Sequence, residues 1–256
     1  MTNASVPPEL SIRPLAESGV LVEVGATIES RLVARVMALT SSIDAAALPG
    51  VVDVVPSYTT IMVVFDPSTT DTDHVISSIR HLAVEPTTAA PPSAREVTIP
   101  VAYGGAHGPD LAAVADYTGL APDEVVARHA NGDYLVACMG FAPGFGFLVG
   151  LPSALETPRR PSPRTRVPRG SVGIGGAQTG VYSLDTPGGW NLIGRTPVPL
   201  VDLGGPAPFL LQPGDRVTFE PISAARYEEI ASQGAVTTNG PNPELPSPPP
   251  PLSADA

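Results

Sequence analysis

CMGFAPGFGFLVGLPSALETPRRPSPRTRVPRGSVGIGGAQTGVYSLDTPGGWNLIGRT, residues 138–196, is the stretch of the chain that decides the fold. Glycine and proline are frequent in it, but they are interleaved with apolar and aromatic residues rather than with Ser, Glu or Lys. Flexible linkers lack such apolar content, so we expect ordered strands and loops here. From Tyr134 onward, short β-rich runs are separated by Gly/Pro turns every eight to twelve residues or so, which predicts a β-barrel or β-sandwich. We expect the last strand of this part at 216–220.

The residues before this stretch predict a smaller α/β unit. Two short strands are expected within residues 10–25, and an antiparallel pair at 51–55 and 60–65. Thr27 is expected to cap a helix between them, and Asp71 a second helix after them. Apolar residues of the first helix recur at helical spacing, namely Ile28, Leu32, Val33, Val36 and Leu39. The order β, α, β, β, α is that of a ferredoxin-like, split βαβ unit.

The segment EPTTAAPPSA, residues 85–94, marks the expected domain boundary. We therefore predict an α+β chain with a ferredoxin-like α/β domain at 1–90, a β-barrel domain at 91–225 and a C-terminal extension at 226–256. Asp110 is expected to cap a short helix that ends at Gly119, and Pro122 to begin the next helix. Seven prolines lie between positions 241 and 251, so we expect the tail to be disordered.

Composition excludes several functional classes. The chain has 256 residues, 43% of them hydrophobic, and a formal net charge of −11, which argues against a nucleic-acid binder. No apolar run reaches the roughly 18 residues that a membrane span needs, and no secretory signal is visible at the N-terminus. Cys138 is the only cysteine, and the histidines have no metal-ligand spacing. We expect a cytoplasmic protein that binds no metal, membrane or nucleic acid.

Every basic residue of the chain is arginine, and there is no lysine. A Walker-type phosphate loop, a Schiff base and a Ser–Lys nucleophile pair all require lysine. The sequence therefore excludes these three kinds of site. Any ATP that is used must be bound in another way or by another chain.

An arginine cluster is the strongest functional signal. Five of the fourteen basic residues fall within eleven positions: Arg159, Arg160, Arg164, Arg166 and Arg169. A guanidinium offers paired donors that match a carboxylate or phosphate, and the interspersed prolines stiffen the backbone that carries them. We predict a site for a carboxylate substrate, a phosphate or an acidic face of a partner, with Arg164 and Arg166 as the best candidates. The alternative is a solvated loop whose arginines pair with acidic residues.

Two further glycine-rich segments carry candidate residues. In GGAQTG, residues 175–180, backbone amides can point at an anion while Gln178 and Thr179 supply hydrogen bonds; the alternative is a barrel turn. In TPGGWNLIGRT, residues 186–196, Trp190 is expected to pack in the core, whereas Arg195 can face the same cleft as the arginine cluster.

Two more positions are weaker candidates. Phe145 lies in GFAPGFGF, residues 140–147, which is typical either of an aromatic loop beside a pocket or of a bulged core strand. His129 lies near the expected end of a helix, where it can be a catalytic group or can simply favour the helix dipole. Cys138 has apolar neighbours, and no Gly-x-Ser-x-Gly elbow is present, so nothing indicates a nucleophile. The catalytic residues therefore stay unassigned.

At GFAPGFGFLVGLP, TPRRPSPRTRVPRGSVGIGGAQTGVY, TPGGWNLIGRTP and LLQPGDRVTF the chain resembles the 5-oxoprolinase B-subunit family, also called allophanate hydrolase subunit 1 or the KipI family. The resemblance covers roughly residues 10–222. It implies a small α/β domain followed by a cyclophilin-like β-barrel. It also implies a KipA-like partner (the C subunit of 5-oxoprolinase) and a third, LamB/YcsF-like chain (the A subunit), with which ATP is used to convert 5-oxoproline into glutamate. Related sequences form carboxyltransferase subdomains C and D of urea carboxylases.

The positions that match the family motifs include most of the candidate residues. They are Gly140, Pro143, Gly144, Phe145, Pro158, Arg159, Arg160, Pro163, Arg164, Arg166, Gly176, Gln178, Thr179, Gly180, Gly188, Gly189, Trp190 and Arg195. Two departures are small: Gly175-Gly176-Ala177 replaces the usual Ala-Gly-Gly, and Val149 stands where the family usually has glycine. Both exchanges should keep the fold.

Three functional classes follow from the resemblance. The favoured one is a non-autonomous subunit of an ATP-dependent 5-oxoprolinase that binds no cofactor alone and acts on a small carboxylate. The candidate binding or interface residues are Arg160, Arg164, Arg166, Gln178, Thr179, Arg195, Phe145 and His129. The alternatives are a regulatory module that inhibits a histidine kinase and a component of an allophanate hydrolase or urea carboxylase. Proline isomerisation is not expected, because a cyclophilin-like fold alone does not carry that activity.

Overall fold

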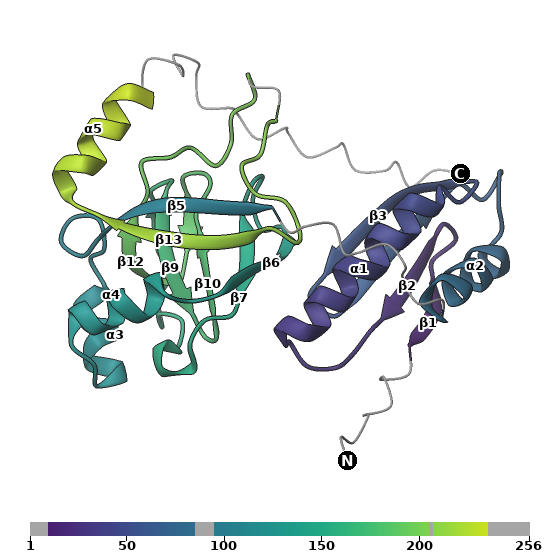
Figure 1. Ribbon diagram of the computed structural model, residues 1–256, viewed down its shortest axis with the longest axis horizontal. Coiled ribbons are helices and arrows are strands. Elements are labelled where there is room, and N and C mark those ends of the chain that lie inside the picture. Colours follow the sequence, from purple (N-terminus) through teal and green to yellow (C-terminus); the bar gives the residue numbers. More distant parts are fainter. Residues whose placement is uncertain (1–9, 85–94, 205–206, 235–256) are drawn as a thin grey trace, which may run out of the picture.

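The structure, a computed structural model, describes residues 10–84, 95–204 and 207–234. It consists of a small α/β part and a closed β-barrel that lie side by side (Figure 1). This arrangement confirms the predicted α+β fold class. The expected boundary segment and the proline-rich tail lie outside the described residues, so the domain limits stay predictions.

The N-terminal part is a four-stranded sheet with two helices. Its elements are β1 (Ser11–Leu15), β2 (Gly19–Glu23), α1 (Ser30–Ala46), β3 (Val51–Ser57), β4 (Thr60–Phe65) and α2 (Thr72–Val84). The strand order is β1-β2-β4-β3, and each neighbouring pair is antiparallel. Strands β2 and β3 therefore run in the same direction with β4 between them, which is the predicted split βαβ arrangement.

The predicted cap of the first helix is wrong. Helix α1 begins at Ser30, its N-cap residue is Glu29, and no side chain caps it. The hydroxyl of Thr27 instead donates to the carboxylate of Glu29 at 2.8 Å, so it is not available to the helix amides. Ile28 consequently precedes the helix and is exposed, whereas the other four predicted apolar positions are buried. The prediction for α2 is confirmed, because Asp71 Oδ1 accepts a hydrogen bond from the backbone N–H of His74 at 2.8 Å.

Seven strands close into the barrel in the order β10-β7-β6-β13-β5-β12-β9. They are β5 (Glu96–Tyr103), β6 (Tyr134–Met139), β7 (Gly146–Val149), β9 (Ser171–Gly175), β10 (Gln178–Val181), β12 (Asn191–Arg195) and β13 (Arg216–Ile222). The remaining elements are α3 (Leu111–Thr118), α4 (Pro122–Ala130), the 3₁₀ turn η1 (Ser153–Leu155), the separate pair β8 (Arg164–Val167) and β11 (Thr186–Gly188), and α5 (Ala224–Gly234). The barrel confirms the first of the two alternatives that the Gly/Pro-punctuated β-rich pattern left open.

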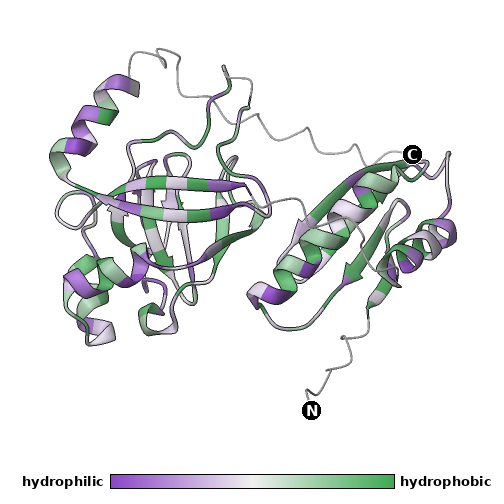
Figure 2. Cartoon of the chain, in the orientation of Figure 1, coloured by the Kyte–Doolittle hydropathy of each residue, from purple (hydrophilic) through white to green (hydrophobic). Residues whose placement is uncertain are grey.

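Alternation of apolar and polar residues builds the barrel core. Along β5, Val97, Ile99 and Val101 point inward, and the residues between them face outward, which Figure 2 shows as alternating colours. Trp190 packs in a second apolar cluster with Phe145 and Tyr182, so the core role predicted for the tryptophan is confirmed.

Strands β5 and β13 are paired in parallel, although most of the barrel is antiparallel. The register places Ile222 of β13 opposite Ala102 of β5, and on the other side of β5 Ala102 is opposite Arg195 of β12. Parallel strands end at the same edge of a sheet. The loop that follows β5 and the helix that follows β13 therefore leave the barrel at the same end.

The two parts of the molecule contact each other through a small apolar cluster and through hydrogen bonds. Val33 of α1 packs against Ala137 and Val149 of the barrel. The side-chain amide of Gln178 donates to the hydroxyl of Tyr58 at 2.6 Å, which joins β10 to the turn between β3 and β4. The α/β part is thus fixed to the side of the barrel.

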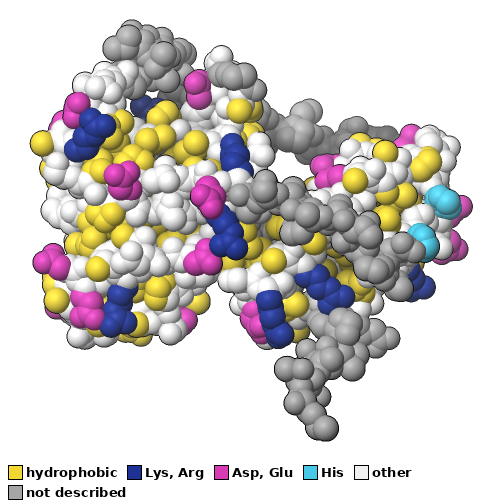
Figure 3. Space-filling model, viewed as in Figure 1, with side chains coloured by type: hydrophobic (Ala, Val, Ile, Leu, Met, Phe, Trp, Pro, Cys, Tyr) yellow, Lys and Arg dark blue, Asp and Glu magenta, His cyan; other side chains and the backbone are white. Residues whose placement is uncertain are grey.

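Within the described ranges, no helix is long and apolar enough to cross a bilayer. The same residues contain no group of three or more His, Cys, Asp or Glu side chains suited to hold a metal ion. On the face shown in Figure 3, basic and acidic side chains are interspersed.

Candidate functional site

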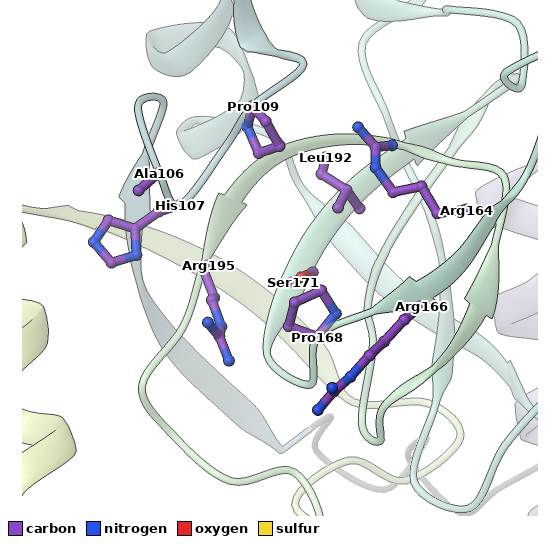
Figure 4. Close-up of a pocket in the computed structure, with 9 residues that line it drawn as sticks. All are labelled: Ala106, His107, Pro109, Arg164, Arg166, Pro168, Ser171, Leu192 and Arg195. Carbon is purple, nitrogen blue, oxygen red and sulfur yellow. The ribbon is translucent and has the colours of Figure 1, made fainter.

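A cavity of about 130 Å³ lies at the end of the barrel where β12 ends and the loop after β5 begins. Its walls come from four segments, and its polar lining is dominated by arginine. The lining residues are Ala106, His107, Pro109, Arg164, Arg166, Pro168, Ser171, Leu192 and Arg195 (Figure 4). We call this cavity the arginine pocket. It brings together three of the predicted site residues: Arg164, Arg166 and Arg195.

Local structure explains why these arginines meet. Arg164 and Arg166 are two positions apart on strand β8, and side chains with this spacing lie on the same side of a strand. Arg195 ends strand β12, which lies next to β9 in the barrel. In Figure 4, His107 and Arg195 stand on one side of the pocket, and Arg164 and Arg166 on the other.

Asp110 is a buried carboxylate that bonds two lining residues of the pocket, Arg164 and Leu192. Its Oδ1 accepts hydrogen bonds from Arg160 Nη1 at 3.0 Å and Arg164 Nη2 at 2.8 Å, and its Oδ2 accepts one from the backbone N–H of Leu192 at 2.7 Å. The prediction that this residue caps a helix is half correct: Asp110 is the N-cap residue of α3, but its side chain makes no capping bond. The carboxylate is buried and holds two arginines in place instead.

The second wall is organised by Asp185. Pairing of β8 with β11 brings this residue beside Arg166, whose Nη2 donates to Asp185 Oδ2 at 2.6 Å. The pKa of Asp185 is held below its usual value, chiefly by the hydrogen bond from the backbone N–H of Arg169 and also by Arg166. The ion pair is exposed on the arginine side, so it contributes little to stability.

Arg195 differs from the other two arginines. Its Nε donates to the backbone oxygen of Arg169 at 3.0 Å, and none of the carboxylates in the described part of the chain forms an ion pair with it. Arg164 also retains a buried Nη1 group that has no partner among the described residues.

The charges around the pocket do not balance. Three guanidinium groups line the pocket, those of Arg164, Arg166 and Arg195, and among the described residues they pair with two carboxylates, those of Asp110 and Asp185. The surplus is positive in a chain whose overall charge is −11. A pocket with free guanidinium donors and a positive surplus favours a small anion, and a carboxylate matches the paired donors best.

The other predicted residues lie outside the arginine pocket. Gln178 is engaged with Tyr58 at the contact between the two parts of the molecule. Gly175 and Gln178 pair with each other across the turn between β9 and β10, so GGAQTG forms the barrel turn that the sequence left as its alternative. Phe145 is buried against Tyr182 and Trp190, and Arg160 reaches the site only through Asp110.

His129 and Thr179 form a hydrogen-bonded chain inside the barrel. Thr179 Oγ1 donates to the backbone oxygen of Gly173, so it must accept from His129 Nε2 at 2.9 Å. His129 Nδ1 then accepts from the hydroxyl of Tyr103 at 2.8 Å. Complete burial lowers the pKa of His129 to about 3. The imidazole is therefore uncharged at neutral pH, which excludes the interpretation that it favours the helix dipole.

Four polar residues of the site were not predicted. Asp110 was assigned to helix capping, His107 stands alone among glycines, and Ser171 and Asp185 have no motif of their own. The segment YGGAHGPD, residues 103–110, follows a strand directly and has glycines that allow a tight return of the chain. That context could have indicated a site loop, but only the fold shows which strands it approaches.

Comparisons with known proteins agree with this architecture. The family model for the carboxyltransferase domain, subdomain C and D, matches residues 10–211. A protein from Escherichia coli O157:H7 that is named as the B subunit of 5-oxoprolinase is 48% identical over 68% of this chain and 79% of its own length. A protein of the same name from Bacillus subtilis is 38% identical over 84% of this chain and 94% of its own length. The crystal structure of TTHA0988 superimposes with a TM-score of 0.70 and 34% identity over 93% of this chain, which spans only 42% of that protein.

Proposed function

The chain belongs to the family of carboxyltransferase domains, subdomain C and D, and on this premise we propose that it is the B subunit of an ATP-dependent 5-oxoprolinase. The observation that carries the proposal is the arginine pocket, because 5-oxoproline is a small carboxylate. The two relatives named as 5-oxoprolinase B subunits align with most of this chain. The arginine pocket and the names of these two relatives both favour a small carboxylate as the substrate.

The dimensions of the pocket suit a single small metabolite. Its volume of about 130 Å³ is well below the roughly 300–1,000 Å³ of pockets that take drug-sized ligands. Leu192, Pro109 and Pro168 provide apolar wall around the charged groups. A compact ring with one carboxylate meets both requirements, since the carboxylate can bind the guanidinium groups while the ring contacts the apolar wall.

Each polar group then has a defined task. Arg195 uses its two Nη groups to bind the substrate carboxylate, because its Nε is already engaged with the Arg169 backbone. Arg164 and Arg166, which line the pocket, add positive charge beside the same carboxylate. Ser171 and His107 supply further hydrogen bonds at the wall. These groups bind and orient the lactam, and a fixed orientation is a large part of the rate gain in such reactions.

The chain completes its reaction with other proteins. The absence of lysine leaves no conventional phosphate loop, so the ATP-binding groups are assigned to a partner. The family resemblance implies two partners, a KipA-like C subunit and a LamB/YcsF-like A subunit. We assign carboxylate recognition in that assembly to this chain, at the arginine pocket.

Reconstitution tests the proposal. This chain is co-expressed with the KipA-like and LamB/YcsF-like proteins of the same genome, and ATP-dependent release of glutamate from 5-oxoproline is measured. We expect activity only when all three chains are present. A stable complex that releases no glutamate would exclude 5-oxoproline as the substrate and leave another amide or urea compound. Failure of the three chains to associate would favour the regulatory module.

A further inference from the structure

The C-terminal helix α5 reaches the arginine pocket because of the parallel β5–β13 pair. Both strands end at the same edge, with Ile222 opposite Ala102. Ser223 then caps the N-terminus of α5, since its hydroxyl accepts a hydrogen bond from the backbone N–H of Arg226 at 3.2 Å. Tyr227 is the fourth residue of the helix, and its backbone N–H donates to the backbone oxygen of Ser223 at 2.9 Å. Its side chain is buried although the helix lies on the outside of the barrel.

The ring of Tyr227 packs against the imidazole of His107. The two ring centroids are 4.3 Å apart and the planes are inclined by 42°. This is the shortest centroid distance among the described aromatic pairs. His107 is also a wall residue of the arginine pocket. The helix therefore contacts a wall residue of the arginine pocket.

The loop that carries His107 needs such support. Gly104 and Gly105 both adopt positive φ, and the backbone N–H groups of His107 and Gly108 both donate to the Gly104 oxygen. These bonds fix the backbone of the loop. Close packing fixes it further, since a Cβ at Gly108 would collide with the backbone carbonyl of Ile193. These bonds do not hold the imidazole itself, which forms no hydrogen bond with the described residues. Among the described rings, only that of Tyr227 contacts the imidazole.

We infer that Tyr227 is a positioning residue that holds the His107 imidazole at the arginine pocket, where it hydrogen-bonds an oxygen of the bound carboxylate substrate. The inference rests on the proposed function and deepens it, because it adds the C-terminal helix to the substrate site. The aromatic ring does the positioning, and the phenol oxygen is not required.

A double-mutant cycle tests this inference. The variants are Tyr227→Ala, Tyr227→Phe, His107→Ala and the double Ala variant, and Tyr117→Ala on the exposed face of α3 is the control. In the reconstituted complex we expect Tyr227→Ala to raise KM for 5-oxoproline about five- to tenfold with kcat within about twofold. Tyr227→Phe should keep the wild-type KM, because the aromatic ring is retained. The double variant should be no worse than His107→Ala, because the effect of Tyr227 passes through His107.

Direct binding separates this inference from the proposed function. The full chain alone is titrated with 5-oxoproline while the imidazole NMR signals of His107 are followed. Tyr227→Leu, which keeps apolar bulk without a stacking ring, replaces the alanine variant if that one does not fold. We expect the His107 signals to shift in wild type and the dissociation constant to rise at least about fivefold in the Leu variant.

Three outcomes would overturn the inference. Equal affinities of wild type and Tyr227→Leu would remove the positioning role and leave the proposed function intact. Additive losses in the cycle would show that Tyr227 acts independently of His107. Wild-type His107 signals that do not respond to 5-oxoproline would exclude His107 from the substrate site, and the glutamate assay would then decide separately whether the proposed function stands.

Discussion

Asp110 Oδ1 lies 2.8 Å from Nη2 of Arg164, although the two residues are 54 positions apart in the chain. The same oxygen accepts from Arg160, and the other carboxylate oxygen holds the backbone of Leu192. One buried carboxylate thus links the helical end of the barrel to the arginine-rich loop and to β12. This carboxylate therefore holds two lining residues of the arginine pocket, Arg164 and Leu192.

Replacing Asp110 should damage both the fold and the site. In Asp110→Asn the two guanidinium groups lose their counter-charge, and both are only partly exposed. Removing one partner of a fully buried pair costs about 3–5 kcal/mol, so we expect about 1–3 kcal/mol here after allowing for solvent. Urea unfolding measures the stability, and glutamate release by the complex should fall more than tenfold. Asp116→Asn, on the exposed side of α3, is the control and should match wild type.

Arg195→Ala should affect binding without affecting the fold. Its guanidinium has no carboxylate partner within the described chain, so its removal leaves no buried acid unpaired. A charge-assisted hydrogen bond contributes about 1.5–3 kcal/mol, which corresponds to a rise in KM of about 10- to 150-fold. Steady-state kinetics of the complex and urea unfolding of the chain are the two measurements. Arg128→Ala, in an exposed helical pair with Glu124, is the matched control. Unchanged KM in Arg195→Ala would exclude this residue from the site.

The sequence predicted the strands and the arginines better than it predicted their neighbours. Arg164 and Arg166 could be selected because they stand two apart between prolines, and strand β8 does place them on one pocket. Gln178 looked equally promising, but a glycine-rich turn has the same composition whether it binds an anion or closes a hairpin. Asp110 and His107 could not be selected, because their partners come from segments brought close only by closure of the barrel.

Gln178 should matter for the contact between the two parts of the molecule rather than for substrate binding. Its amide donates to Tyr58, and burial raises the pKa of this tyrosine to about 12, so the phenol stays neutral. We expect Gln178→Ala and Tyr58→Phe each to lower the free energy of unfolding by about 1 kcal/mol, with a coupling of similar size in the double variant. KM for 5-oxoproline should stay within about twofold. A large rise in KM in Gln178→Ala would return this residue to the substrate site.

The buried imidazole of His129 should make the fold sensitive to mild acid. Its pKa is about 3 in the folded chain and about 6.5 when unfolded, so between these values the unfolded chain binds one more proton. The contribution of the neutral imidazole to the free energy of unfolding is therefore fully present above about pH 6.5. It decreases as the pH falls, by about 2 kcal/mol between pH 7 and pH 5. His129→Gln should be less stable at pH 7, because it disturbs the bonds to Tyr103 and Thr179, but it should lack this part of the pH dependence. Urea unfolding of both proteins at pH 5, 6 and 7 measures the difference, and parallel pH profiles would show that His129 is not neutral in the fold.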